Sequence, residues 1–501
     1  MNRTTLNDQG ISRRELLKVL APVAAGQTAG ARPAAEDRRL NIVFIMADDL
    51  GWRDTAVYGS RYYETPNIDR LASKGMLFTQ AYAANPLCSP TRSSIMTGLY
   101  PARTGITTPS CHLPEEILEK RLVEKASNTQ KALQARSLTR LKREYFTLAE
   151  ALKQAGYATA HIGKWHLGRE PYDPLNQGFD VDIPHTFGPG PAGGYMAPWS
   201  FWKNQGRDGE HIEDRMAEEA VKFISQNRQR PFYLNYWPFS VHTPWNAKKE
   251  LIKKYIAKAD LMNPQRNPVY AAMVQSLDEA VGRVVRGIEE AGVADHTMIV
   301  FFSDNGGVHW GSAEEPSMLH ADFQAVPATS NAPLRGGKAT LYEGGTREPC
   351  IVVWPGQVKR GSRSEEVVSS VDFYPTILDA TGTKPQAGQQ FDGVSIVPAL
   401  RAGRLNREAI FCHFPHYTPR TGAVPATWVR KGDWKLIRMY CDNPDRTDRF
   451  ELYNLKQDLG EMNNQASQMP EKMKELNELI NGFLQRTEAL VPRPNPDYRR
   501  A

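Results

Sequence analysis

The chain has 501 residues, 41% hydrophobic and 24% charged, which indicates a globular protein long enough for one large and one small domain. The formal net charge is +6, but residues 1–35 carry five basic and two acidic side chains. The remaining charge of about +3 is too small to indicate a nucleic-acid partner, and the five cysteines are too few for a disulfide-based scaffold.

The N-terminal segment resembles a bacterial export signal. It contains Ser12-Arg13-Arg14-Glu15-Leu16-Leu17-Lys18, which is similar to a twin-arginine motif, and then a weakly apolar stretch, 19–31, that is too short to span a bilayer. Small residues offer cleavage sites after Ala31 or Ala35. We therefore expect a twin-arginine translocase to export the protein, which would be periplasmic or secreted without a membrane anchor. A disordered basic tail is the alternative.

From Leu40 onward, short apolar runs alternate with amphipathic segments, which is typical of an α/β domain with a mostly parallel sheet. The expected strands cover residues 40–46, 158–162, 232–237, 298–303 and 350–354. Helices are expected after Thr65-Pro66, with Thr65 as N-cap, after Thr147, where Glu150 completes a capping box, and over 270–291. We interpret the polar and basic stretch 107–143 as an insertion, and the Gly- and Pro-rich stretch 188–202 as an ordered loop near the mouth of the site.

After Arg401 the pattern changes to that of a smaller α+β domain. Apolar runs at 411–414, 427–429, 434–439 and 451–453 predict an antiparallel sheet, and an apolar stripe from Met473 to Leu484 predicts a closing helix. We expect the last ten residues to be loosely held. The predicted organisation is an export signal at 1–35, a main domain at 36–400 with a large, mixed, mostly parallel sheet between helices, and a small domain at 401–501.

Polar side chains follow four of the expected strands, at the point where each strand ends. They are Asp48 and Asp49, Lys164 and His166, His242, and Asp304 and Asn305. Because ligands bind outside the carboxyl ends of the strands in open parallel sheets, we expect these side chains to meet at one edge.

Four of these residues offer the oxygen donors of a metal site: Asp48, Asp49, Asp304 and Asn305. Such donors suit Ca²⁺ first and Mg²⁺ second, whereas zinc usually recruits histidine or cysteine. Each pair taken singly is more typical of a turn or a helix cap. The two pairs together, both following strands, predict a metal site.

One cysteine lies in a motif that resembles a modification signal. Cys88, Pro90 and Arg92 have the spacing Cys-x-Pro-x-Arg at the expected start of a helix, and residues 93–103 continue it as Ser-Ser-Ile-Met-Thr-Gly-Leu-Tyr-Pro-x-Arg. Both parts are similar to the signature of the type I, formylglycine-dependent sulfatases, which are arylsulfatase-like members of the alkaline phosphatase superfamily. Further similar blocks are residues 41–52, 163–168, 303–307, 331–345 and 451–455. The resemblance therefore covers the chain from Asn41 to about Ala466.

The resemblance implies an alkaline phosphatase-like fold whose main domain is catalytic. It also implies that a formylglycine-generating enzyme oxidises Cys88, and that the hydrate of the resulting aldehyde attacks sulfur and forms a covalent sulfo-enzyme. The oxidised Cys88 would join the Ca²⁺ or Mg²⁺ site. Arg92 would hold the hydrate and the metal-site carboxylates.

The same resemblance implies roles in the reaction for five residues. Lys164 and Lys338 would bind sulfate oxygens as compact positive charges. His242 together with Lys338 would protonate the leaving alcohol, and Asp304 would help to deprotonate the attacking hydroxyl. His166 would take a proton from the other hydroxyl of the hydrate, so that sulfate leaves and the aldehyde returns.

The expected function is hydrolysis of sulfate monoesters, with aryl sulfates as assay substrates and sulfated saccharides as natural ones. An alternative is a phosphonate monoester or phosphodiester hydrolase, because relatives of this fold share the formylglycine and the metal site. A second alternative is a non-catalytic binder of sulfated glycans, which would follow if Cys88 stays a thiol.

Overall fold

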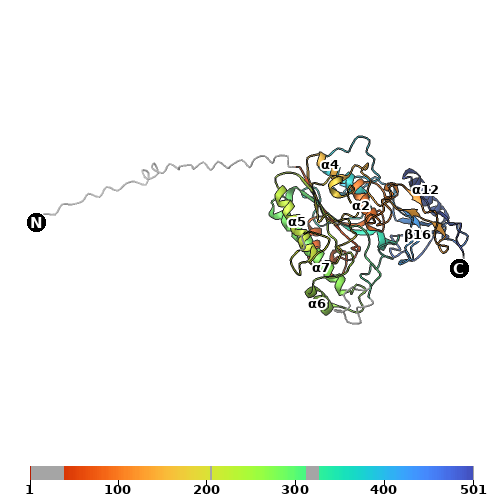
Figure 1. Cartoon of the computed structure of the whole chain (residues 1–501), viewed down its shortest axis with the longest axis horizontal. Helices are drawn as coiled ribbons and strands as arrows, with labels where there is room; N and C mark the ends of the chain where they lie inside the picture. The colour runs from red at the N-terminus through yellow and green to blue at the C-terminus, as the bar shows by residue number, and fades with distance from the viewer. Residues whose placement is uncertain (2–38, 204–205, 312–325, 500–501) are drawn as a thin grey trace. The chain divides into compact units, whose positions relative to one another are not determined.

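The computed structural model describes Met1 and residues 39–203, 206–311 and 326–499 (Figure 1). Apart from Met1, the expected export signal at 1–35 lies outside these residues and stays a prediction. Within the described ranges, no helix is both long and apolar enough to cross a membrane.

A nine-stranded sheet forms the centre of the main domain. Its strands are β1 (Asn41–Ala47), β2 (Met76–Tyr82), β6 (Ala158–Gly163), β7 (Val181–Ile183), β8 (Phe232–Trp237), β9 (Thr297–Ser303), β10 (Arg347–Val353), β11 (Ser362–Ser364) and β12 (Val368–Ser369). The order is β11-β2-β10-β9-β1-β8-β6-β7, and β12 also pairs with β2. β1, β6, β7, β8 and β9 pair in parallel, whereas β10 runs antiparallel to both β9 and β2. β11 and β12 pair in parallel with β2. The expected mixed, mostly parallel sheet is confirmed, and β1, β6, β8 and β9 end at the same edge.

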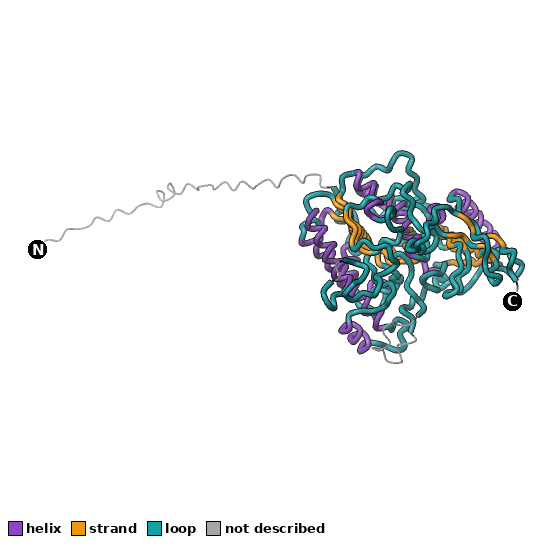
Figure 2. The backbone as a smooth tube through the Cα atoms, in the orientation of Figure 1, coloured by secondary structure: helices purple, strands orange, loops and turns teal. Residues whose placement is uncertain are grey.

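Both faces of this sheet are buried, which explains why its strands are continuous apolar runs. In β1, Val43 and Ile45 belong to one core, and Phe44 and Met46 belong to the other. The helices in the first core are α1 (Pro66–Lys74), α5 (Ile212–Asn227), α6 (Lys249–Lys258) and α7 (Pro268–Glu290). Those in the second core are α2 (Cys88–Thr97), α4 (Leu148–Gln154) and α10 (Phe373–Thr381). The helices therefore lie on both sides of the strands (Figure 2).

The expected helix starts differ in how they are capped. At α4 the capping box is confirmed, because the Glu150 N–H donates to Thr147 Oγ1 over 3.2 Å and the Thr147 N–H donates to Glu150 Oε2 over 2.7 Å. At α1 the chain enters the helix at Thr65 as expected, but the Thr65 hydroxyl donates to Asp69 and accepts the N–H of Ala56. Thr65 therefore occupies the N-cap position without a side-chain cap.

A second, antiparallel sheet forms the smaller domain. Its strands, in order, are β13 (Ile410–Phe414), β14 (Ala426–Lys431), β15 (Trp434–Met439) and β16 (Arg449–Asn454). The helix α12 (Pro470–Arg486) lies beside this sheet (Figure 1). Its side chains Leu476, Ile480 and Phe483 pack into the core of this domain. The predicted small domain with an antiparallel sheet and a closing helix is confirmed. Its boundary at residue 401 stays a prediction.

The 107–143 stretch pairs with the C-terminal residues. Within the stretch, β3 (Arg121–Leu122) pairs with β5 (Ala135–Arg136). The strand β4 (Ala132–Leu133) of the same stretch pairs with β17 (Arg493–Pro494) near the C-terminus. Asn495 is buried, its N–H donates to the carbonyl of Lys131 over 2.8 Å, and its amide donates to two further carbonyls of the stretch. For residues 493–499 the expectation of a loosely held C-terminus is therefore wrong, and the sequence did not reveal it because the partner strand lies far away in the chain.

A buried ionic cluster joins the two sheets. Lys435 Nζ on β15 lies 2.9 Å from Glu343 Oε1 and 2.8 Å from Glu461 Oε1, and all three side chains have 0% exposure. Glu343 begins α9 (Glu343–Thr346), and its own N–H donates to Glu461 over 2.6 Å. Through α9 the small domain therefore supports the segment that carries Lys338.

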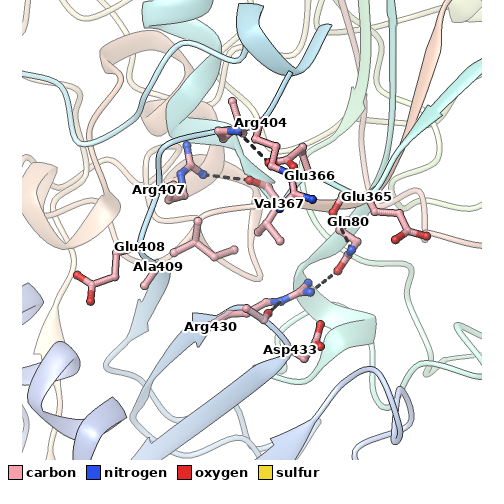
Figure 3. Close-up of a pocket in the computed structure, with 13 residues that line it drawn as sticks. Gln80, Glu365, Glu366, Val367, Arg404, Arg407, Glu408, Ala409, Arg430 and Asp433 are labelled. Carbon is pink, nitrogen blue, oxygen red and sulfur yellow. Dashed lines mark hydrogen bonds between the residues drawn. The ribbon is translucent and has the colours of Figure 1, made fainter. Parts of the chain in front are cut away.

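A cavity of about 380 Å³ lies beside this junction, between β2 and the strands β13 and β14 (Figure 3). Its lining is mostly charged and includes Glu365, Glu366, Arg404, Arg407, Arg430 and Asp433. The Arg430 guanidinium donates to Gln80 and to Tyr82 of β2. These contacts join the domains, and the lining residues are distinct from those around Cys88.

Candidate active site

Cys88 is the first residue of α2, a helix whose ten residues are all buried. Pro90 lies in the first turn, where its missing N–H costs nothing, and Gly98 ends the helix with a φ of 69°. The Ser89 hydroxyl donates to the carbonyl of His166 over 2.7 Å and ties this turn to the segment after β6. Cys88 therefore lies at the positive end of the helix dipole.

The predicted polar residues do meet at one edge of the sheet. The carboxyl ends of β1, β6, β8 and β9 bring together Asp48, Asp49, Lys164, His166, His242, Asp304 and Asn305. Ligand atoms of Asp48, Asp49, Cys88 and His242 all lie within 4.8 Å of one another. Lys338, which comes from a loop before α9, completes the group.

Cys88 contacts both a carboxylate and an ammonium group. Its Sγ lies 3.6 Å from Asp48 Oδ1 and 3.7 Å from Lys338 Nζ. Lys338 Nζ also lies 2.7 Å from Asp49 Oδ2, and Lys164 donates to Asp48. Each aspartate of the first pair therefore has its own lysine.

Arg92 ties the helix to the strand ends. Its Nε and Nη2 donate to Asp304 Oδ2 over 3.0 and 2.8 Å, and its Nη2 lies 3.4 Å from Asp48 Oδ2. The guanidinium also donates to the carbonyl of Lys164 and lies over the ring of Trp237, 5.2 Å from its centroid. Arg92 has 0% exposure. Its guanidinium is therefore an internal positive charge that contacts Asp48 and Asp304 and not solvent.

The oxygen donors fit a hard divalent cation. Asn305 donates to Asp49 Oδ1 over 2.8 Å, while its own Oδ1 is buried and accepts no hydrogen bond from the described residues. Asp49 has a φ of 62°, a left-handed backbone that a non-glycine residue rarely adopts outside functional sites. Three carboxylates and a free amide oxygen are the ligands that Ca²⁺ and Mg²⁺ take.

Burial and charge set the protonation of the site. Burial raises the pKa of the Cys88 thiol to about 12, and burial together with the charge of Asp48 raises the pKa of Asp304 to about 6. Burial would also raise the pKa of Asp49, but the positive charges around it, above all Lys338, hold it below its usual range. For Lys338 burial opposes the charged form, yet the charge of Asp49 raises its pKa. Lys338 is therefore a cation facing an anion.

The two predicted histidines occupy different surroundings. His242 Nδ1 donates to the carbonyl of Thr243 over 2.8 Å, and its Nε2 lies 3.8 Å from Asp49 Oδ2. Burial, then the charges of Lys164 and Lys338, lower the pKa of His242 to about 3. A Cβ at Gly190 would lie 3.1 Å from the His242 ring, so the loop 188–202 lies against the site as expected.

His166 contacts a residue that sequence reasoning missed. His166 Nε2 lies 2.9 Å from Nδ1 of His112, which comes from the 107–143 stretch. A lone histidine in an irregular segment carries no spacing that predicts a contact, so no signal in the sequence indicated His112.

Comparisons with known proteins agree with the geometry. Residues 40–383 match the family model described as Sulfatase, and residues 337–488 match the model for the C-terminal part of N-sulphoglucosamine sulphohydrolase. The N-acetylgalactosamine-6-sulfatase of Sus scrofa is 33% identical over 459 residues, which cover 86% of this chain and 78% of that protein. The crystal structure of Ps i-CgsB in complex with k-i-k-neocarrahexaose aligns with a TM-score of 0.70 and 26% identity, over 89% of this chain and 93% of that one. The phosphonate monoester hydrolase of Agrobacterium radiobacter aligns with a TM-score of 0.60 over 92% and 100%, but at 18% identity this is a likeness of fold alone.

Proposed function

This chain belongs to the sulfatase family of the alkaline phosphatase superfamily and is a sulfuric ester hydrolase, and we infer that Cys88 acts after oxidation to formylglycine. The observation that carries this proposal is the position of Cys88, 3.6 Å from Asp48 and 3.7 Å from Lys338 at the start of α2. A buried thiol with a pKa of about 12 is protonated at neutral pH and is a poor nucleophile. The hydroxyls of an aldehyde hydrate at this position would be nucleophiles beside a carboxylate that can orient them.

A metal ion would be held by Asp48, Asp49, Asp304 and Asn305 together with the oxidised Cys88. Ca²⁺ suits these donors first and Mg²⁺ second. When bound, the ion supplies Lewis acidity that withdraws negative charge from the sulfate oxygens. Arg92 contacts both Asp48 and Asp304 and so fixes the positions of their carboxylates.

The other residues bind the ester and move protons. Lys164 and Lys338 contact the sulfate oxygens, because their ammonium groups already face the centre of the site. Asp304 accepts the proton of the attacking hydroxyl. Lys338, with His242 beside it, donates a proton to the leaving alcohol. His166 then takes the proton of the second hydroxyl, and sulfate leaves from the covalent sulfo-enzyme.

We propose sulfated saccharides as the natural substrates. A 33% identical relative is an N-acetylgalactosamine-6-sulfatase, and the structure of Ps i-CgsB holds an oligosaccharide. We also propose that a formylglycine-generating enzyme and a twin-arginine translocase act during maturation, and that the protein works in the periplasm or outside the cell. Support for export comes from the sequence alone, in which the Arg13-Arg14 motif is followed by the apolar stretch 19–31 and by small residues.

Turnover of 4-nitrophenyl sulfate, compared with an aryl phosphonate monoester at equal concentration, tests the reaction class. We expect the sulfate to be the better substrate, and a faster phosphonate reaction would favour the phosphonate hydrolase alternative.

Mass spectrometry of the tryptic peptide 75–92 tests the nucleophile. We expect a peptide lighter by the difference between a thiol and an aldehyde. A peptide with an intact thiol, from protein without activity, would favour the glycan-binding alternative.

A further inference from the structure

The contact between His112 and His166 has a chemical consequence for the reaction. The Nδ1 of His112 lies 2.9 Å from Nε2 of His166, and the two rings are 5.2 Å apart. His166 is 1% exposed, whereas His112 is half-buried. His166 has a φ of 56°, so a left-handed backbone aims its side chain. The partner ring comes from the 107–143 stretch, which lies between the blocks that resemble the sulfatases.

Hydrolysis of a sulfate monoester produces a proton that must leave the site. At neutral pH the ester monoanion and water give an alcohol, a sulfate dianion and one proton. In the proposed function this proton passes from the second hydroxyl of the nucleophile to His166. Because His166 is buried, it needs a partner to carry the proton away.

His166 cannot keep the proton in these surroundings. Burial first, and then the positive charges of Lys164, His112 and Arg92, lower the pKa of His166 well below its ordinary value, and His242 adds to this effect. Burial and the charge of Lys164 also lower the pKa of His112. The His166 Nδ1 is buried and has no hydrogen-bond partner among the residues that the structure describes. Nδ1 is thus the nitrogen left to accept a proton while Nε2 faces His112.

We propose that His112 is a positioning residue for sulfate release, which holds the His166 ring and conducts the product proton from it to solvent; this rests on the proposed function. The hydroxyl proton goes to Nδ1 of His166 while the O–H electrons form the C=O bond. The C–O bond to sulfate breaks, and its electron pair leaves with sulfate. The proton on His166 Nε2 passes to His112 Nδ1, and the one on His112 Nε2 passes to water.

Addition of water to the aldehyde resets the pair. The carbonyl oxygen takes back the Nδ1 proton of His166, and the proton on His112 Nδ1 returns to His166 Nε2. His112 Nε2 regains a proton from solvent, and the added water releases one. The cycle therefore releases one proton in total, as the overall reaction requires.

The variants His112→Ala and His112→Asn test this inference. Asparagine keeps a hydrogen-bonding atom near the position of Nδ1 but cannot relay a proton. The control is His296→Ala, because His296 is also partly exposed but precedes β9 at the opposite end of that strand. Thermal melting of each variant checks folding. Rapid mixing of Ca²⁺-supplemented enzyme with excess 4-nitrophenyl sulfate separates the first turnover from the steady state.

We expect both His112 variants to release one equivalent of nitrophenol at the wild-type rate and then to slow. The steady-state rate should fall by about a hundredfold, the lower end of a general acid–base contribution. Peptide 75–92 from the quenched variants should carry sulfate, and added imidazole should speed the slow phase. His296→Ala should behave as the wild type.

Two results would overturn the inference. A rise in KM with an unchanged steady-state rate would make His112 a substrate contact, and an equal loss of the first and later turnovers would make it a structural residue. Absence of sulfate turnover in the wild type would instead overturn the proposed function, and this inference with it.

Discussion

Replacing Lys435 by methionine tests how the small domain holds the catalytic segment. The substitution removes the positive charge of Lys435, which contacts the carboxylates of Glu343 and Glu461, and all three side chains have 0% exposure. Methionine keeps most of the apolar part of the lysine side chain. Glu343 would retain the Tyr82 hydroxyl at 2.7 Å and Arg347 at 3.3 Å. Glu461 would lose its ion pair and keep only the N–H of Glu343. The cost therefore falls mainly on Glu461.

Removing one partner of a buried ion pair costs about 3–5 kcal/mol, because the other group is left as an uncompensated buried charge or must take up a proton. Burial already raises the pKa of Glu461 to about 7 beside Lys435. Since Glu343 keeps Arg347 as a partner, we expect the lower end of this range, about 3 kcal/mol. The double variant Lys435→Met with Glu461→Gln removes the stranded charge, and we expect it to regain about 1–2 kcal/mol of the loss. The recovery distinguishes a stranded charge from simple loss of packing.

Urea unfolding measured by circular dichroism, with calorimetry as a second probe, gives these differences. A chain with two sheets need not unfold in one step, so the first transition is the one to compare. A loss below about 1 kcal/mol, or a double variant no more stable than the single one, would refute the reasoning. We also expect Lys435→Met to lower activity, because α9 follows the Lys338 loop.

Three further predictions follow from the described contacts. Cys88→Ala should lower hydrolysis of 4-nitrophenyl sulfate by more than about 10³-fold with little change in melting temperature; surviving activity would mean another nucleophile. Removal of metal by EDTA should abolish activity and lower the melting temperature, and Ca²⁺ should restore both; insensitivity to EDTA would contradict an oxygen-donor site. Burial lowers the pKa of His413 to about 4. Between pH 4 and 6.5 the unfolded chain therefore binds a proton that the folded chain does not, and the free energy of unfolding falls as the pH is lowered through this window. His413→Gln should therefore flatten the fall in stability over this window by up to about 1.4 kcal/mol per pH unit, and an unchanged slope in pH-dependent unfolding would contradict the shift.

Local patterns predicted the parts of the fold that depend on neighbouring residues. The capping box of Thr147 and Glu150 formed because both partners lie in one turn. Asp48, His242 and Asp304 could be expected at one edge because each follows an apolar strand and the strands are parallel. The antiparallel direction of β10 was not predicted, since an apolar run of seven residues reads the same in either direction.

Contacts between distant segments could not be predicted in the same way. Thr65 lost its capping role because Asp69 and Ala56 use its hydroxyl. The C-terminus is held by Lys131, which no periodicity connects to Asn495. His112 reaches His166 through an irregular segment whose path depends on the packing of the whole domain. In each case tertiary geometry, and not a local propensity, decides the contact.

The complete burial of α2 sets an order of events for the maturation of this protein. Cys88 is 1% exposed, and Arg92, one turn further along α2, bonds to Asp304, a residue synthesised much later. In the maturation that we propose, an oxidising enzyme must therefore reach the cysteine while this stretch is still an open peptide, before the later strands dock. Folding and oxidation then compete in time, and a molecule that folds first is trapped without its nucleophile. The specific activity of a preparation would thus record how fast the chain folded relative to its modification, and slowing synthesis or folding should raise it.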